Sequence, residues 1–137
     1  MSIFDSMNIA ASGMSAQRLR MNIISANIAN ADSVKTPEGG PYKRRDVVFE
    51  AVGYGKFSNI LKEVKVADVV RDDTPPKLVY DPNNPLANKN GYVAYPNINP
   101  VVEMTNLIDA MRTYQANVSV VDAAKQMIQA ALSVLRA

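Results

Sequence analysis

The chain has 137 residues, 47% of them apolar, which is the size of one ordinary domain with enough apolar material for a core. Fifteen basic and thirteen acidic residues give a formal charge of +2, too small to attract nucleic acid or a membrane surface over long range. The chain has no Cys and no His, which excludes zinc-finger ligation, thiol catalysis and histidine-based triads. We therefore expect no metal, no cofactor and no small-molecule substrate.

The first residues show no signature of a cleaved secretion signal. Residues 1–5 lack a basic segment, and the apolar residues after them are spaced helically instead of forming a continuous run. No stretch approaches eighteen uninterrupted apolar residues. The sequence therefore predicts a soluble chain with no membrane span and no cleaved signal.

The first predicted element is a helix from about Ile3 to Ala31, roughly 43 Å long, with Ser2 as its N-cap. Its apolar positions form two stripes about 200° apart around the helix axis. The first stripe consists of Ile3, Met7, Ala10, Met14, Gln17, Met21, Ile24, Ile28 and Ala31, and the second of Ile9, Ser12, Ala16, Leu19, Ile23 and Ala26. Asn27 and Asn30 are predicted to cap its end, with hydrogen bonding between subunits as the alternative.

The middle of the chain is predicted to form a small antiparallel β domain over residues 35–80. Strands are expected at Tyr42 to Val52, Leu61 to Val70 and Lys77 to Tyr80, where β-branched residues alternate between Gly and Pro breaks. Residues 81–100 are dense in Asn and Pro and are predicted to be an extended connector. The basic run Lys43, Arg44, Arg45 is interpreted as the solvated edge of a strand.

The last predicted element is a helix from about Val101 to Arg136 that contains no Gly or Pro. It also has two apolar stripes. The first consists of Met104, Leu107, Met111, Tyr114, Val118, Val121, Lys125, Ile128, Leu132 and Leu135, and the second of Ala116, Val120, Ala123, Met127, Ala130 and Val134. Methionines on such stripes are interpreted as packing residues, not as metal or redox sites.

Two helices that pair within one chain bury only one stripe each, so the second stripes are expected to meet helices of other subunits. The predicted fold is mainly α with a small β unit. The N-terminal helix (1–34) and C-terminal helix (101–137) are expected to pair as an antiparallel coiled coil, with the β domain (35–80) and connector (81–100) between them.

Gln17 and Lys125 interrupt the first stripes, and two interpretations stay open. Each is either a solvated gap or a polar residue that fixes the register, because a slipped pairing would bury it without a partner. The adjacent carboxylates Asp72 and Asp73 precede Thr-Pro-Pro, which is typical of a turn, and extended neighbours point apart. They give no support for acid and base catalysis.

Several motifs together resemble bacterial flagellar basal-body rod proteins, most closely those of the proximal rod. The segment from Ser12 to Ala31 resembles the N-terminal signature shared by rod, hook and hook-associated proteins. The C-terminal half resembles proximal rod proteins in the order and spacing of its motifs, which are residues 81–85, 91–93, 96–97, 103–104, 112–117 and 123–127. The short total length agrees with this comparison, because the distal rod and hook relatives have a large insertion between the same helices.

The resemblance implies a structural subunit that polymerises through its terminal helices into the tubular drive shaft that transmits torque. It also implies export by the flagellar type III apparatus without a cleaved signal, a periplasmic location, and association with copies of itself and other rod proteins. The alternative is a cytosolic coiled-coil adaptor or export chaperone. The predicted assembly interface consists of Ile3, Met7, Met14, Leu19, Met21, Ile23, Ile24, Asn27, Ile28, Asn30, Met104, Leu107, Met111, Tyr114, Asn117, Val118, Val120, Val121, Met127, Ile128, Leu132 and Leu135.

Overall fold

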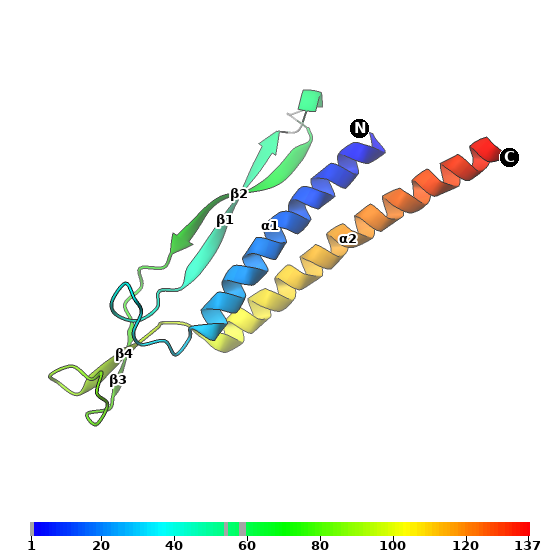
Figure 1. Ribbon diagram of the computed structural model, residues 1–137. Helices are drawn as coiled ribbons and strands as arrows, with labels where there is room; N and C mark the ends of the chain where they lie inside the picture. The colour runs from blue at the N-terminus through cyan, green and yellow to red at the C-terminus, as the bar shows by residue number, and fades with distance from the viewer. Residues whose placement is uncertain (1, 54, 58–59) are drawn as a thin grey trace.

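The computed structural model describes residues 2–53, 55–57 and 60–137. A long helix stands at each end of the chain, and two small antiparallel sheets lie between the two helices in sequence (Figure 1). The elements in chain order are α1 (Ile3–Ala29), β1 (Arg45–Gly53), a short 3-10 helix (Gly55–Phe57), β2 (Lys62–Arg71), β3 (Lys77–Tyr80), β4 (Tyr92–Tyr95) and α2 (Pro100–Arg136). The prediction of a mainly helical chain with a small β unit is confirmed.

Short polar side chains set the ends of α1. The Ser2 hydroxyl accepts from the backbone N–H of Phe4, and the Asp5 carboxylate accepts from the Ser2 N–H at 2.7 Å, which makes a capping box. Asn30 follows the last helical residue, and its side chain donates to the carbonyl of Ala26. The predicted N-cap and the capping role of Asn30 are confirmed, and the helix ends at Ala29 instead of Ala31.

The two helices pack against each other and run in opposite directions (Figure 1). Asn27 near the end of α1 bonds to Glu103 in the first turn of α2. Further along, Nη1 of Arg20 lies 3.7 Å from Oδ2 of Asp109, and Gly13 lies against the side chain of Asn117. Because α2 has 37 residues and α1 has 27, the end of α2 extends beyond this pairing, and residues 129–137 are all exposed.

Small residues bring the two helices close together. Ala10 on α1 is buried, as are Ala110 and Ala124 on α2. A Cβ atom added at Gly13 would lie only 2.8 Å from Nδ2 of Asn117, so the backbone of α1 approaches that side chain closely. This close approach explains why Gly13 is tolerated in the helix interior despite a propensity cost of about 1 kcal/mol relative to Ala.

We expect Gly13→Leu to lower the free energy of unfolding by about 1–3 kcal/mol, because the larger side chain forces the helices apart. Ser15→Leu is the matched control, since Ser15 is exposed on the same helix and has room for a larger side chain. Urea unfolding followed by circular dichroism measures both. Equal stability of the two variants would show that the close approach at Gly13 is not needed.

The face of α2 that meets α1 is not quite the predicted first stripe, because every second position is shifted by one residue toward the N-terminus. It contains Leu107, Tyr114, Val121 and Ile128 as predicted, but Glu103, Ala110, Asn117 and Ala124 replace Met104, Met111, Val118 and Lys125 as the inward partners. Met104, Met111 and Lys125 are exposed, while Val118 is half-buried. The prediction failed because it favoured large apolar residues, whereas close packing selects small ones. Within the chain, Lys125 is solvated and fixes no register.

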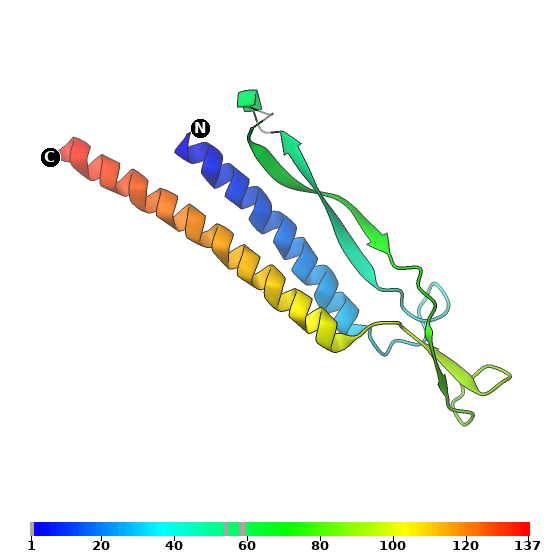
Figure 2. The ribbon, with the colours of Figure 1, turned by 180° about the vertical axis from the view of Figure 1, so that it is seen from behind.

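The hairpin of β1 and β2 covers the other side of α1, as the two views of the ribbon show (Figures 1 and 2). Ala16 on the second stripe is 3% exposed, and the hydroxyl of Ser12 accepts from the backbone N–H of Val64 at 3.1 Å. The inference that only other subunits can cover this stripe is therefore wrong for α1. The β1–β2 hairpin lies along α1 and is not a unit separate from the helices.

The second sheet pairs β3 with β4 and protrudes from the end of the molecule where the two helices meet their connecting loops (Figure 1). β3 has the predicted bounds, but β4 lies inside the predicted connector. Tyr80 and Tyr92 pack edge to face across the pair with ring centroids 5.3 Å apart, and Val93 is fully buried. The β unit is thus two separate two-stranded sheets.

Candidate assembly surface and buried polar cluster

Large apolar residues are exposed along α2, interspersed with polar ones such as Arg112, Asp122 and Lys125. Its exposed large apolar residues are Val101, Val102, Met104, Ile108, Met111, Val120, Met127, Leu132, Val134 and Leu135, which we call the α2 apolar surface. Val120 and Met127 are 45% and 57% exposed, and they belong to the predicted second stripe, all of whose members are exposed. Nothing else in the described part of the chain covers this surface.

The structure divides the predicted interface residues between the two helices. Those on α1 are buried or half-buried within the chain, against α2 or against the β hairpin. On α2, six of them are exposed, namely Met104, Met111, Val120, Met127, Leu132 and Leu135. The free apolar surface therefore lies on α2.

The exposed side of α1 is polar by contrast. Ser15, Arg18, Asn22 and Ser25 lie along it. Its apolar members are Ala11, Ala29 and, in the first turn, Phe4, which is 61% exposed. A helix whose apolar sides are covered and whose remaining side is polar has no further apolar stripe to bury. This asymmetry between α1 and α2 was not visible from the helical periodicity alone.

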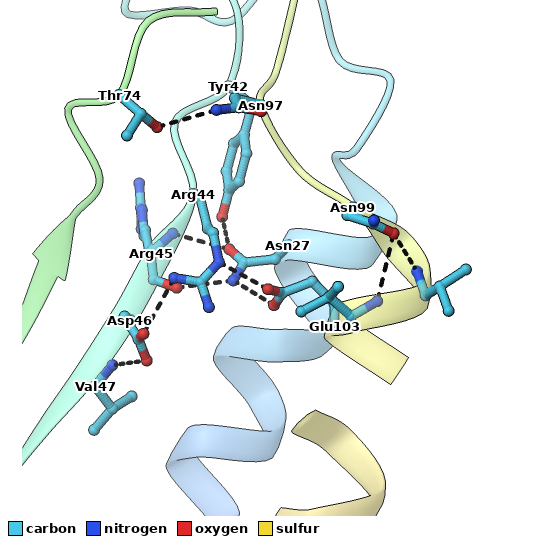
Figure 3. A network of polar contacts seen from close by, with 12 residues as sticks. Asn27, Tyr42, Arg44, Arg45, Asp46, Val47, Thr74, Asn97, Asn99 and Glu103 are labelled. Atoms are coloured by element: carbon cyan, nitrogen blue, oxygen red, sulfur yellow. Dashed lines mark hydrogen bonds and ion pairs between the residues drawn. The ribbon is translucent and has the colours of Figure 1, made fainter. Parts of the chain in front are cut away.

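A buried polar cluster joins the helices to the β hairpin where they meet (Figure 3). Asn27 is fully buried, and its amide makes four hydrogen bonds. Its Nδ2 donates to the carbonyl of Arg45 at 2.8 Å and to Oε2 of Glu103 at 3.0 Å, while its Oδ1 accepts from the Arg45 N–H and the Tyr42 hydroxyl. The side chain thus pairs with the backbone of β1 as a neighbouring strand would. It does not cap the helix, which corrects the prediction.

Glu103 and Arg44 form the charged part of the cluster. Nε of Arg44 donates to Oε1 of Glu103 at 2.7 Å, and the Glu103 side chain is only 2% exposed. The same guanidinium donates to Asp46 at 3.1 Å. Burial by itself lowers the pKa of Arg44, but its bonds and attraction to the two carboxylates outweigh this and raise that pKa above its usual value. We call Asn27, Tyr42, Arg44, Arg45 and Glu103 the Asn27 cluster.

The basic run therefore has three different environments. Arg44 is held in the Asn27 cluster, whereas Lys43 pairs with exposed Asp73 at 3.0 Å and the Arg45 guanidinium lies over the Tyr42 ring. Interpreting the whole run as a solvated strand edge was wrong for Arg44. A sequence signal did exist, since Glu103 lies seven residues before Ala110 on the same helix face and needs a charged partner there.

Asp72 forms a turn beside the cluster. Its carboxylate accepts from the backbone N–H of Thr74 at 3.0 Å, and this bond is the main cause that lowers the pKa of Asp72. The Thr74 hydroxyl and the charge of Arg44 act in the same direction, while burial opposes them. The predicted turn at Asp72 is confirmed.

We expect the Asp72 turn to weaken in acid. The pKa of Asp72 is lower in the folded than in the unfolded state, so the ionised carboxylate stabilises the fold. This contribution is fully present above the ordinary pKa of about 3.9, and it disappears as the pH falls through the lowered pKa. The wild type should therefore lose stability relative to Asp72→Asn below about pH 4. Parallel urea titrations at several pH values measure this difference, and a constant difference would contradict the expectation.

Within the described residues, no group of three or more His, Cys, Asp or Glu is placed to hold a metal ion. α2 is long and apolar enough, by length and composition alone, to cross a membrane, and 6% of its most apolar window is buried. The search for uninterrupted apolar runs does not detect this helix, because scattered polar residues interrupt its apolar residues while its mean hydropathy stays high. Such a helix needs an apolar surrounding, which helices of other protein subunits also supply.

The fold and its surfaces define a class of protein, an elongated structural subunit whose helix α2 leaves large apolar residues exposed. Comparisons with known proteins agree. A family model for flagella basal body rod proteins matches residues 7–35, and one for the C-terminal region of flagellar basal body rod FlgEFG proteins matches residues 89–134.

Individual relatives match over nearly the whole chain. The chain is 46% identical over 136 residues to the flagellar basal-body rod protein FlgC of Buchnera aphidicola subsp. Schizaphis graminum, with 98% of both chains covered. It is 40% identical to FlgC of Borreliella burgdorferi, with 99% of both covered, and 44% identical to FlgC of Salmonella typhimurium, with 93% of this chain and 94% of that protein covered. The chain belongs to the FlgC family of flagellar basal-body rod proteins.

Proposed function

We propose that this chain is built into the rod of the flagellar basal body through the α2 apolar surface, which packs against helices of neighbouring rod subunits. As a member of the FlgC family the chain is a structural subunit of that rod. The relatives are rod proteins, which does not favour the alternative of a cytosolic adaptor or export chaperone.

The observation that supports this proposal is the amount of surface that the chain leaves uncovered. Its accessible surface is 9341 Å². A compact monomer of the same mass, 14.9 kDa, exposes roughly 7000 Å². The buried core is correspondingly thin, since five of the seven buried apolar residues in the described part are alanines. A chain with so much apolar surface on one helix gains stability when other subunits cover that helix.

Neighbouring helices suit the α2 apolar surface better than a lipid bilayer. Asp122 and Lys125 lie in the C-terminal half of α2, where charges at the centre of a bilayer cost about 2.5–3.5 kcal/mol each on insertion scales. In a bundle, the same side chains reach water or polar partners between helices. The exposed alanines Ala116, Ala123 and Ala130 recur every seven residues, which lets another helix approach closely.

The remaining parts of the proposal follow from family membership. The pairing of α1 with α2 is proposed to act as an antiparallel coiled coil in the rod. The β domain of residues 35–80 lies between the helices in sequence and is extended by β4 from within residues 81–100. We place the subunit in the proximal rod within the periplasm and propose export by the flagellar type III apparatus without a cleaved signal. Torque then passes through many parallel helix contacts between this chain, its copies and other rod proteins.

Thiol footprinting tests the surface directly, because the chain contains no Cys. Met127→Cys, on the α2 apolar surface, should react with a maleimide in the free chain and be protected in isolated rods. Lys89→Cys, exposed in the loop between β3 and β4, reports whether the reagent reaches the assembled rod at all. Rapid labelling of Met127→Cys in intact rods would refute burial of this surface by assembly.

A further inference from the structure

The protruding β3–β4 hairpin has little support of its own. In the described part of the chain, the extensive contacts of these two strands are with each other. A two-stranded hairpin alone is marginally stable in water. Its direction relative to the helices must therefore be set where its two connecting segments, residues 72–76 and 96–99, meet the rest of the molecule.

Both connecting segments pass beside Arg44 (Figure 3). The backbone N–H of Asp72 donates to the carbonyl of Arg44 at 2.8 Å, which continues the β1 and β2 pairing by one residue. On the other segment, Asn97 donates to the hydroxyl of Thr74 at 3.4 Å, an exposed and long hydrogen bond, and Pro96 is buried. The base of the hairpin is thus attached through the backbone of Arg44 and through the ion pair of Lys43 with Asp73, and the ion pair is exposed on both sides.

The side chain of Arg44 is in turn fixed to both helices. Its guanidinium bonds to Glu103 in the first turn of α2, and Glu103 accepts from Asn27 of α1. A planar guanidinium orients its donors rigidly, and a pair with so little exposure is weakly screened by salt. One residue therefore connects the base of the hairpin to both helices.

We propose that Arg44 and Glu103, aligned by Asn27, are positioning residues that fix the direction of the β3–β4 hairpin relative to the helix pair. This goes beyond the proposed assembly through α2 and is independent of it, because it concerns a single chain. Removal of the Arg44 guanidinium leaves the Asp72 backbone bond in place but frees the strand to tilt. The hairpin then samples several directions while the helices stay paired.

Distance measurements between spin labels on the dilute full-length chain test this, since labels attach only to introduced cysteines. The first pair, Arg18→Cys on the exposed side of α1 with Lys89→Cys in the β3–β4 loop, reports the hairpin direction. The second pair, Arg18→Cys with Gln115→Cys on α2, reports the helix pair alone. Each pair is measured in three backgrounds: unchanged, Arg44→Gln and Arg45→Gln.

We expect Arg44→Gln to replace the narrow distance peak of the first pair with a broad distribution, while the second pair keeps its peak. Arg45→Gln is the matched control, because within the described residues the Arg45 guanidinium forms no ion pair, so both peaks should stay narrow. A narrow first peak in Arg44→Gln would overturn the proposal. Loss of both peaks would also overturn it, since it would assign the ion pair to the general stability of the helices.

Discussion

Asn27→Ala is expected to lower the free energy of unfolding by about 3–5 kcal/mol, because the buried groups around the amide lose their partner. The N–H and carbonyl of Arg45, the Tyr42 hydroxyl and one oxygen of Glu103 all bond to this side chain. Asn27 is fully buried, so these groups stay unsatisfied in the variant unless the structure rearranges or a water enters the space that the amide leaves. A loss of this size is a large part of a domain's total stability.

Asn30→Ala is the matched control for that experiment. Asn30 lies three residues further on and is half-buried. Its amide donates to the carbonyl of Ala26 and accepts from the Ser33 hydroxyl. We expect a loss of about 1–2 kcal/mol, the net worth of one or two ordinary hydrogen bonds whose partners stay within reach of water. Urea unfolding followed by circular dichroism gives both values. Similar losses for the two variants would mean that the Asn27 cluster contributes no more than an ordinary helix end.

Local signals in the sequence predicted much of this fold because they depend on short stretches of chain. Ser2 caps α1 as expected, and β3 has the expected bounds, because Pro75 and Pro76 stop any strand before it. The predicted helix after Asn99 begins at Pro100, where Asn99 accepts from the next backbone N–H groups. These features need no knowledge of distant contacts.

The predictions that were wrong concern contacts between residues far apart in the sequence. Glu103 bonds to residues 76 and 59 positions away, and no helical periodicity reveals such partners. Ala110 and Ala124 are buried, whereas Met104 and Met111 are exposed. Small side chains let the backbones of the two helices approach closely, and this matters more here than the apolar area of a side chain. For the candidate assembly site, the sequence predicted that each helix has more apolar surface than one partner covers, but not that the β hairpin covers α1.

That difference between the helices makes the C-terminal half of α2 the place where a single charge should have the largest effect on function. Val120 is 45% exposed in the chain and belongs to the α2 apolar surface. Val118 is half-buried on the neighbouring side of the helix. A carboxylate at residue 120 stays in water while the chain is free, so the free chain should fold normally.

Val120→Asp is therefore expected to abolish rod assembly and swimming while leaving the helix content of the free chain unchanged. Burying an unpaired carboxylate between subunits costs several kcal/mol, and every repeated interface in the polymer incurs that cost. Val118→Asp should additionally lower the helix content of the free chain, because it disturbs the packing of α2 within the subunit. Complementation of a rod-deficient strain, with circular dichroism of each purified variant, measures both effects. Normal swimming with Val120→Asp would show that the C-terminal half of α2 is not an assembly surface, since no rod could tolerate that charge within a dry helix contact.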